Sequence, residues 1–358
     1  MPDPIPPHAP KKLPVIPGVS PSSLAFFVAV RDAGLDSSVP HPVHARNTGL
    51  VQAWLRWDVQ REHRLDAMLS DHERRFTDNS FMVGRAMSLD PAYRLGHVTL
   101  SSDPRDLDVL TNSIAAQLMY WRCKHTLFEL TPALEQWLVR SDLGDDIPFD
   151  LLRPPVPACY ISFGPELRQA VQSFTTDQAV FDHVKGVYVM ESYTTGRRAI
   201  TLLPVFVFEG RPLTAVGAIE MICEDEQMPL TAAIQRLCVG VDADIVRHHR
   251  SVAQLCVKVF LYLRVQQAQL QEEQPHTAAL AQLRGLGPKK AAKLQRQLGK
   301  LYDRVLLGPP MATVEHGTPH EVAPHWRRGH FRMQAHGPER QLRKVLFIAP
   351  MVIRADRL

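Results

Sequence analysis

The sequence lacks the patterns that mark membrane, secreted or zinc-binding proteins. No apolar run approaches the roughly 20 residues needed to cross a bilayer, and prolines stand where a secretory signal would have its apolar segment. The five cysteines include no C-x-x-C pair, which argues against a zinc site or a disulfide framework and favours free thiols in a reducing compartment. We therefore expect a cytoplasmic protein with no membrane partner.

Signatures of common enzymes and nucleotide-binding proteins are also missing. No P-loop, G-x-S-x-G or Rossmann glycine pattern occurs, so we expect no small-molecule cofactor and leave open whether the chain is an enzyme. Asp244 and His248 stand four residues apart, which places them on one face of a helix, and Asp242 or His249 would extend a metal site. No third ligand from another element accompanies them. A solvated helix face is the preferred interpretation, and no metal is expected.

The charges are distributed unevenly along the chain. From Arg284 to Leu358 the sequence holds 15 Lys/Arg and 5 Asp/Glu, whereas the first 283 residues hold 26 Lys/Arg and 32 Asp/Glu. The protein therefore combines a mildly acidic body with a strongly basic C-terminal fifth. Such segregation favours an anionic partner, most often nucleic acid or a ribosomal surface.

Composition and periodicity divide the chain into five parts. Eight of the first 21 residues are proline, which predicts an extended, disordered tail over residues 1–22. Helical spacing then predicts a helical region over 23–150. Its helices are expected over 48–75, from Asp103, and from Thr131–Pro132. The remaining parts are an α+β core over 151–270, a basic linker or helix over 271–312, and a basic β-hairpin over 313–358.

The central part combines strand and helix patterns. The runs ACYISF, KGVYVMESY and AITLLPVFVFEG are β-branched and aromatic, and a TTGR turn joins the last two. Three strands cannot close a barrel, so helices must cover one face of the sheet. They are predicted over Leu213–Cys223 and from Leu230 to about Leu270, the second with an apolar stripe between Val252 and Leu263. The prediction is an α+β fold with a helical N-terminal region, a central, mainly antiparallel sheet with packed helices, and a C-terminal β-hairpin.

The string LRGLGPKKAAKL resembles a helix-hairpin-helix motif, in which a Gly-x-Gly turn offers backbone N–H groups to a DNA phosphate. Gly285, Gly287, Lys289 and Lys290 fit that pattern. A basic linker ahead of a helix that begins at Pro288 fits the same residues. Because the motif is short and permissive, we prefer the linker.

The densest cluster of candidate site residues is PHWRRGHFRMQAHGPERQLRKVLFIAP, residues 324–350. Alternate residues of a strand share a face, so Trp326, Arg328, His330, Arg332 and Gln334 are predicted to project together, and a returning strand would add Arg343 or Lys344. Aligned cations repel one another. They require either a polyanion as partner or neutralising acids from the body, for which the candidates are Glu220, Glu224 and Asp225.

Three functional interpretations follow for this hairpin. As an RNA-binding surface, it would contact phosphates and stack Trp326 or His330 on a base. The predicted RNA-binding residues are Trp326, Arg327, Arg328, His330, Arg332, Arg343 and Lys344. As a metal-independent ribonuclease, it would use His330 as the catalytic group, with Arg328 and Arg332 stabilising the phosphorane charge and His325 or His336 as the second group. As a non-enzymatic interaction module, it would pair its arginines with acids of its own body.

The string HWRRGHF, followed by a glycine loop and R-K-x-x-F-I-x-P, resembles the C-terminal signature RRGHW…R…W-x-x-P of a plasmid- and phage-borne family, the type V-A anti-CRISPR proteins. The matching positions are Arg327, Arg328, Gly329, His330, Phe331, Arg343, Phe347 and Pro350. Phe331 and Phe347 stand where the family usually has tryptophan. A looser resemblance links PPVPACYISF and HVKGVYVM to two strands of the family, through Pro157, Cys159, Tyr160, Ile161, Gly186, Val187 and Tyr188.

This resemblance implies a function that composition does not. It implies a protein that lowers production of a Cas12 effector by recognising the emerging N-terminal peptide of its target on the ribosome and triggering loss of the message. The implied partners are RNA or the ribosome, and a nascent peptide. The resemblance also disfavours the helix-hairpin-helix, because family members commonly carry a variable basic linker there. Which protein is the target does not follow from the sequence.

Overall fold

The computed structural model of the protein describes residues 39–47, 116–117, 119–121, 123–171, 174–176, 179–194, 197–208, 215–216, 219–237, 243–310 and 325–353. The predicted tail and the helix predicted over 48–75 lie outside these residues, as does most of the helix predicted from Asp103.

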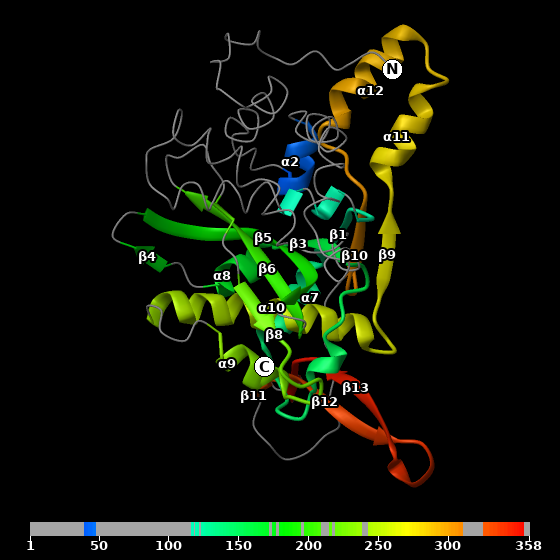
Figure 1. Cartoon of the computed structure of the whole chain (residues 1–358). Coiled ribbons are helices and arrows are strands. Elements are labelled where there is room, and N and C mark those ends of the chain that lie inside the picture. The colour runs from blue at the N-terminus through cyan, green and yellow to red at the C-terminus, as the bar shows by residue number, and fades with distance from the viewer. Residues whose placement is uncertain are drawn as a thin grey trace, which may run out of the picture.

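In the described part of the chain, a nine-stranded sheet forms the centre (Figure 1). Its strands run in the order β7 (Ala215–Val216), β6 (Arg197–Phe208), β5 (Ala179–Thr194), β3 (Ala158–Ser162), β1 (Thr126–Leu130), β10 (Arg304–Leu307) and β9 (Leu270–Glu273), with β4 (Phe174–Thr176) on β5 and β8 (Ile219–Ile222) on β6. β1 pairs in parallel with β3 and β10, and the other pairs are antiparallel. The predicted α+β fold with a mainly antiparallel central sheet is confirmed.

Both faces of this sheet are buried, because its central strands are apolar at nearly every position. Alternate residues of β3 enter different core clusters. Ala158 and Tyr160 belong to the first cluster, and Cys159 and Ile161 belong to the second. The second cluster packs on α7 (Pro132–Val139), α8 (Pro165–Ala170), α9 (Leu230–Gln235) and α10 (Ala243–Arg264). The first cluster packs on α2 (His41–Asn47) and includes Ala116, Met119 and Tyr120. Helices therefore cover both faces of the sheet, not one as we expected.

Two of the predicted helices form as expected. α7 begins at the predicted cap, where the Thr131 hydroxyl accepts a hydrogen bond from the Leu134 N–H at 3.3 Å and Pro132 is the first helical residue. The predicted apolar stripe of α10 is buried from Val252 to Phe260. The stretch from Leu230 to Leu270 divides into α9 and α10, and Leu270 already belongs to β9.

The helix predicted over Leu213–Cys223 is wrong. Its described residues form β7 and β8, and β8 pairs with β6 from Ile219 opposite Leu202 to Ile222 opposite Ala199. Burial along β8 alternates, with Ile219 and Met221 inside and their neighbours exposed. This is the two-residue period of a strand, which a run this short does not distinguish from a helical stripe.

The two strands of the looser family resemblance are neighbours at the centre of the sheet. Tyr160 lies opposite Tyr188 in register, both rings are fully buried, and their centroids are 4.7 Å apart. Gly186 makes room for this packing, because a Cβ there would collide with the Tyr160 hydroxyl and lie 2.5 Å from the Ile161 carbonyl oxygen. These positions therefore shape the core and are not part of a surface site.

We expect Gly186→Ala to lower the free energy of unfolding by about 1–3 kcal/mol, because an added methyl group overpacks a filled core. Urea denaturation measures the change. Gly285→Ala is the matched control: its Cβ would meet only the Gln282 carbonyl oxygen, at 4.0 Å, and a loss below about 0.5 kcal/mol is expected. Equal losses in the two variants would contradict the packing argument.

The C-terminal hairpin consists of β12 (Gly329–His336) and β13 (Leu342–Ile348), joined by the predicted loop around the 3-10 turn Pro338–Arg340. β12 also pairs in parallel with β2 (Ser141–Leu143). A separate two-stranded sheet joins β11 (His325–Arg327) to β14 (Met351–Ile353). Phe331 of β12 is fully buried and stacks on Phe347 of β13, with ring centroids 4.5 Å apart. This aromatic pair anchors the hairpin to the body.

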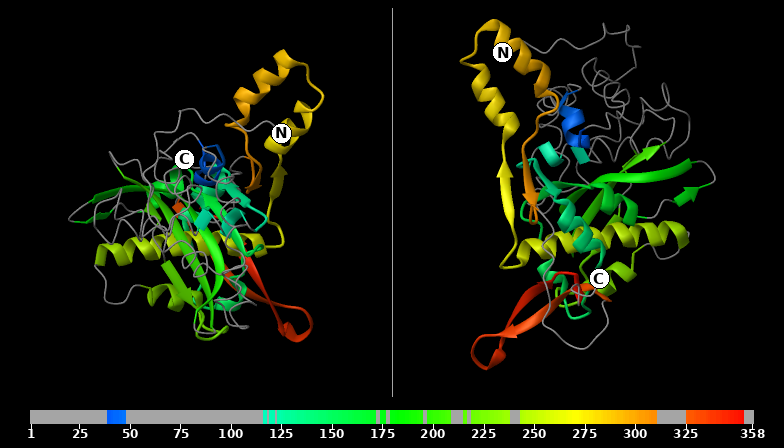
Figure 2. Two further views of the ribbon diagram at one scale, coloured as in Figure 1. Left: turned by 45° about the horizontal axis from the view of Figure 1, so that its top comes forward. Right: turned by 180° about the vertical axis from the view of Figure 1, so that it is seen from behind.

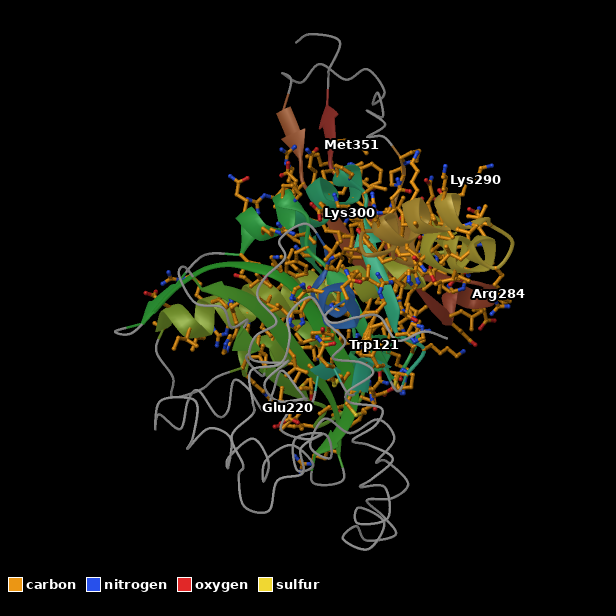
Figure 3. All side chains as sticks on the ribbon, turned by 90° about the horizontal axis from the view of Figure 1, so that it is seen from above. Trp121, Glu220, Arg284, Lys290, Lys300 and Met351 are labelled. Atoms are coloured by element: carbon orange, nitrogen blue, oxygen red, sulfur yellow. The ribbon has the colours of Figure 1, made fainter. Side chains whose placement is uncertain are left out.

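A second projection leaves the body at the other end. β9 and β10 lead to two helices, α11 (Pro275–Leu283) and α12 (Pro288–Leu298), which extend beyond the sheet on the side away from the C-terminal hairpin (Figures 1 and 2). We call residues 274–302 the helical arm. Seen from above, Arg284 and Lys290 lie at the outer side of the arm and Lys300 lies nearer the body (Figure 3).

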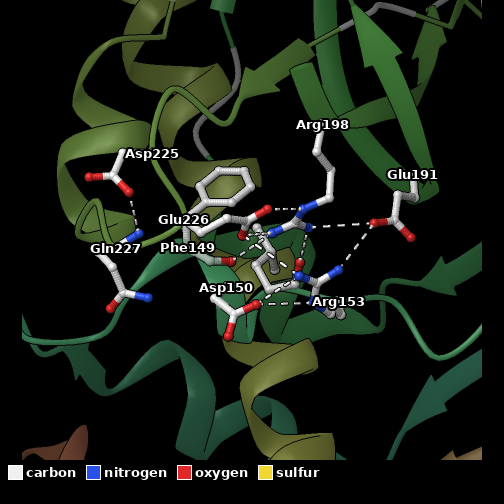
Figure 4. Close-up of polar contacts among 9 residues, drawn as sticks. Phe149, Asp150, Arg153, Glu191, Arg198, Asp225, Glu226 and Gln227 are labelled. Atoms are coloured by element: carbon white, nitrogen blue, oxygen red, sulfur yellow. Dashed lines mark hydrogen bonds and ion pairs between the residues drawn. The ribbon is translucent and has the colours of Figure 1, made fainter. Parts of the chain in front are cut away.

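One ion pair, between a buried arginine and a partly exposed glutamate, joins the sheet to the loops at its edge. Arg198 of β6, whose side chain is 5% exposed, donates from Nε to Glu226 Oε1 at 2.9 Å and from Nη2 to Glu226 Oε2 at 2.6 Å (Figure 4). The same guanidinium donates to the carbonyl oxygens of Leu152 at 2.8 Å and Phe149 at 3.2 Å. The hydrogen bond from Arg198 lowers the pKa of Glu226.

The structure adds two further observations. No helix among the described residues has the length and apolarity that a membrane-spanning segment needs. No disulfide joins the described cysteines, which are Cys123, Cys159, Cys223 and Cys256, and Cys238 lies outside the described residues.

Candidate anion-binding site at the base of the C-terminal hairpin

Segments almost 190 residues apart meet at the base of the hairpin. β2 directly follows α7, and its parallel pairing with β12 places Ser141 opposite Gly329 and Asp142 opposite His330. Gly329 permits this approach. A Cβ at Gly329 would collide with Ser141 Oγ and lie 2.7 Å from Pro350 Cδ. The pairing brings the residues just before β12 beside the end of α7.

A cleft of about 460 Å³ lies at this junction, lined by Val139, Arg140, Asp142, Arg327, Arg328 and Pro350. Its charged lining is three guanidinium groups and one carboxylate. Arg328 Nη1 is 3.6 Å from Asp142 Oδ1, and the two side chains are 79% and 62% exposed. An ion pair this exposed contributes little to folding stability, and it leaves the guanidinium accessible to a ligand. Because guanidinium donors match the geometry of phosphate and carboxylate groups, the cleft suits an anion.

A buried cation lies close to this cleft. Lys258 Nζ, on α10, donates to the carbonyl oxygens of Leu138, at 2.9 Å, and Ser141, so it fixes the end of α7 and the start of β2. Burial lowers the pKa of Lys258 to about 8; Asp142 opposes this shift and Arg328 reinforces it. The ammonium group therefore adds to the positive potential around Arg328.

The hairpin register sorts the remaining cations onto two faces. Arg332 lies opposite Leu346 and Gln334 opposite Lys344, so Arg332 and Lys344 share the outer face with His330. Arg343 lies opposite Ala335, on the face that carries the buried Phe331. Lys344, and not Arg343, is thus the cation that the returning strand adds to this face. Arg343 itself is exposed beyond the edge of the core.

The outer face continues into the cleft, because Asp142 pairs with His330 in register and lines the cleft. The structure therefore brings together Arg327, Arg328, His330, Arg332 and Lys344. The alternation of β12 does not extend to Trp326. The strand is interrupted at Arg328 and resumes as β11, paired with β14, and the Trp326 side chain lies outside the described part of the chain.

The acids expected as internal partners lie elsewhere. Glu224 pairs with Arg236, and Asp225 accepts a hydrogen bond from the Gln227 backbone N–H at 2.9 Å. Glu220 is exposed on β8. Arg327, Arg332 and Arg343 are exposed, and within the described ranges they make no ion pair. The guanidinium groups thus point to solvent, which disfavours the interpretation that they neutralise the protein's own body.

A pair of catalytic histidines is not assembled at the hairpin. His330 and His336 are six residues apart on one strand, which separates them by about 20 Å. The side chain of His325 is not among the described ones. Asp142 is the titratable residue opposite His330.

The residues considered for a metal on α10 diverge. Asp244 is exposed and pairs with Arg247 at 3.2 Å, whereas His248 is 2% exposed and its ring lies 5.3 Å from that of Phe206. The expected solvated face therefore holds for Asp244 but not for His248. No group of three or more His, Cys, Asp or Glu side chains with metal-binding spacing occurs among the described residues, and Asp242 is not one of them.

A second cleft, of about 630 Å³, lies between the body and the root of the helical arm. Its lining combines aromatic and charged side chains, among them Trp121, His125, Tyr302, Arg46, Asp303 and Arg304. The rings of Trp121 and His125 lie 5.1 Å apart with a tilt of 31°, and burial lowers the pKa of His125.

Sequence reasoning missed this second cleft, as well as Arg140 and Asp142 of the first. Each cleft combines residues from segments far apart in the chain, between residues 42 and 305 in one and between 139 and 350 in the other. No local pattern joins them.

Comparison with known proteins gives three findings. The family model described as "AcrVA2-like: Anti-CRISPR type V subtype A2 family" matches residues 128–355. Among solved structures, the chain is similar to one titled "Crystal structure of AcrVA2", with 14% sequence identity and a TM-score of 0.44 over 76% of this chain and 85% of the other. No curated protein matches the sequence.

Proposed function

Since the chain belongs to the AcrVA2-like family, anti-CRISPR type V subtype A2, we propose that it recognises a nascent polypeptide on the translating ribosome and causes loss of the target mRNA. This role requires the cytoplasm, where translation takes place. The observation that carries the RNA-contacting part is the cleft formed by Arg140, Arg327 and Arg328, which continues into the face that carries the exposed Arg332 and the half-buried His330 and Lys344.

The basic surface fits the backbone of a single RNA strand. Arg140, Arg327, Arg328, Arg332 and Lys344 supply five cations, with Asp142 as the acid beside them. Guanidinium groups bind phosphates, and a histidine ring can stack on a base. If about five or six phosphates are contacted, the logarithm of the binding constant should fall with the logarithm of salt concentration with a slope of about −4. Binding indifferent to salt would argue against this surface.

The cleft at the root of the arm supports the peptide-recognising part. Peptide segments are recognised by pockets for individual side chains together with charged or hydrogen-bonding groups at their edges. Here Trp121 and His125 supply apolar ring surface, while Arg46 and Asp303 supply charge of both signs. The cleft thus suits a short extended segment with mixed side chains.

The proposal is tested with a reporter whose coding sequence begins with the first codons of a type V-A effector, expressed with and without this protein. We expect the reporter mRNA to be depleted. Synonymous recoding of those codons should leave the depletion intact, because the peptide is unchanged. A compensated frameshift, which keeps nearly the same RNA but changes the peptide, should abolish it. Reporter mRNA is measured by quantitative PCR, and ribosome profiling finds the depleted transcript if the target is another protein.

The contribution of the hairpin is measured with the double variant Arg327→Ala/Arg328→Ala, which should reduce the depletion and make the salt slope shallower by about 1.4. Arg197→Ala/Arg264→Ala removes the same charge from exposed positions of the body and should leave both unchanged. Loss of depletion in both double variants would indicate a net-charge effect and contradict a role for the hairpin.

A second candidate is a metal-independent ribonuclease at the same place. His330 lies opposite Asp142, and the carboxylate of Asp142 is 3.6 Å from Arg328. A histidine beside a carboxylate and an arginine can move a proton while positive charge stabilises the phosphorane. If this function is correct, purified protein cleaves RNA and His330→Ala abolishes cleavage with little effect on RNA affinity. If purified protein never cleaves RNA and His330→Ala weakens binding, the residue only binds.

A further inference from the structure

The helical arm is a built element and not a linker. Asp303 caps α11, accepting hydrogen bonds from the His276 N–H at 3.0 Å, the Thr277 N–H at 3.1 Å and the Thr277 hydroxyl. At the end of α12, Arg46 donates to the Leu301 carbonyl oxygen at 2.8 Å, and Asn47 donates to that of Gly299 at 2.6 Å. The arm therefore holds its side chains in a defined arrangement relative to the body.

An ion-pair cluster strengthens the root of the arm. Arg304 of β10 pairs with Glu129 of β1 at 2.9 Å and with Glu273 of β9 at 2.7 Å. These acids keep the pKa of Arg304 above its ordinary value despite its burial. The acidic partners thus serve the strands at the root and leave none for the cations farther out.

The arm carries charge of one sign. Residues 274–302 contain six Lys or Arg and no Asp or Glu. All six side chains are exposed, and in the described part of the chain none of them has an ion-pair partner. The six cations are Arg284, Lys289, Lys290, Lys293, Arg296 and Lys300.

This arrangement does not stabilise the arm. Lys289 and Lys293 are four residues apart, and Lys293 and Arg296 three, and like charges at these spacings destabilise a helix. The row from Lys289 to Arg296 spans about 10 Å of helix axis, and Lys300 follows just past the end of α12. Over about 10 Å one strand of a duplex presents about three phosphates. A polyanion would thus convert an unfavourable row of charges into a favourable contact.

The outer turn leaves space for close approach. Gly285 and Gly287 are both exposed, and a Cβ at Gly287 would meet nothing within 4 Å. The leucines of α12, Leu294 and Leu298, are partly buried, so no large apolar side chain accompanies the lysines on that helix. A membrane-surface helix would instead expose an apolar face between its cations. Leu280 of α11 is 38% exposed, but it lines the cleft at the root of the arm. On α12, charge without an exposed large apolar side chain favours a nucleic acid.

We propose that the helical arm is a second nucleic-acid-binding surface, which binds the phosphate backbone of a duplex without reading its sequence. It lies at the end of the molecule away from the C-terminal hairpin (Figures 1 and 2), so the two basic surfaces contact separate segments. The contact is electrostatic, and it does not rest on the function proposed for the hairpin.

The test measures binding of the full-length protein to fluorescent 20-base-pair RNA and DNA duplexes, and to a single strand of equal length, over a range of salt concentrations. Lys289→Ala/Lys290→Ala/Lys293→Ala should weaken duplex binding on the order of 100-fold at 0.1 M salt and make the log–log slope shallower by about 2.7, as expected for three lost phosphate contacts. Comparison of the RNA and DNA duplexes identifies which source of phosphates is preferred. The melting temperature should not fall, because the substituted side chains are exposed and their removal relieves like-charge repulsion.

Two comparisons decide the outcome. Arg197→Ala/Arg247→Ala/Arg264→Ala removes the same charge from exposed positions of the body and should leave the duplex slope within about 0.5 of the parent. An equal loss in this control, or none in the arm variant, overturns the proposal. Binding to phosphatidylserine vesicles that depends on the arm, with no duplex binding, overturns it in favour of a membrane surface. If Arg327→Ala/Arg328→Ala alone removes duplex binding, the arm is not the contact, whatever becomes of the reporter mRNA.

Discussion

Arg198→Met is expected to lower the free energy of unfolding by about 2–4 kcal/mol, because it removes a buried guanidinium and leaves the buried carbonyl oxygen of Leu152 without this donor. Methionine retains most of the arginine volume, so the loss comes from polar contacts rather than from a cavity. The change also removes the bidentate partner of Glu226 and one of the two donors to the Phe149 carbonyl oxygen, which keeps the Leu152 N–H. Equilibrium urea unfolding, followed by circular dichroism, measures the difference.

The same variant should alter the pH dependence of the free energy of unfolding. Arg198 lowers the pKa of Glu226 in the folded state below the ordinary value of 4.5. A carboxyl group with a lowered folded pKa contributes stability above its unfolded pKa and loses it as pH falls through the folded value. Stability attributable to Glu226 should therefore be present above pH 4.5 and decline below it in the parent protein. In Arg198→Met this part of the decline should disappear.

Two control variants test whether the loss comes from the contacts of Arg198 and not from the removal of any arginine. Arg198→Lys keeps the charge but lacks the planar fork that donates to both oxygens of Glu226 and to the backbone, so it should recover only part of the loss. Arg153→Met removes a neighbouring arginine whose side chain is 43% exposed, and it should cost no more than about 0.5 kcal/mol. A loss below about 1 kcal/mol in Arg198→Met, or an equal loss in Arg153→Met, would show that the pair is not what holds these loops to the sheet.

Phe331→Ala should be at least as damaging, with an expected loss of about 3–5 kcal/mol, because it empties a fully buried site. Phe331 stacks on Phe347, whose ring in turn contacts Trp137 of α7 at 6.3 Å and Tyr262 of α10 at 6.0 Å between centroids. This cluster is what ties the C-terminal hairpin to the body. We therefore expect the hairpin to become susceptible to protease at concentrations that leave the parent intact.

A control on the same hairpin makes this prediction specific. Leu342→Ala removes an apolar side chain that is 55% exposed, and it should change the stability by no more than about 0.5 kcal/mol. Since the cleft at Arg327 and Arg328 depends on the docking of β12 against β2, Phe331→Ala should also reduce depletion of the reporter mRNA, while Leu342→Ala should not. Retention of full stability in Phe331→Ala would mean that the hairpin is held by its backbone pairing alone.

The family signature divides into two physical groups. Gly329, Phe331 and Pro350 are buried and set the docking of the hairpin, and Phe347 completes the aromatic cluster. Arg327, Arg328 and Arg343 are exposed. Phe331 and Phe347 therefore contribute packing beneath the surface, whereas the three arginines contribute charge at the surface.

Local patterns in the sequence were sufficient to identify the elements whose burial they determine. Thr131 and Pro132 mark the start of α7, the apolar runs mark β3, β5 and β6, and the glycine-containing loop marks the C-terminal hairpin. The two basic regions follow from composition alone, because an excess of one charge is exposed in any fold. These features depend on residues within a few positions of one another.

Only the tertiary structure decided which segments meet. The parallel pairing of β1 with β10 and of β2 with β12 uses backbone hydrogen bonds, which every residue except proline provides, so side-chain patterns did not reveal it. The pairing of β2 with β12 places Arg140 and Asp142 beside Arg327 and Arg328. The register of β12 with β13 decides that Lys344, and not Arg343, shares a face with Arg332. The pairing of β10 with β1 and β9 carries α11 and α12 outward. The chemistry of each surface was present in the sequence, but its position required the fold.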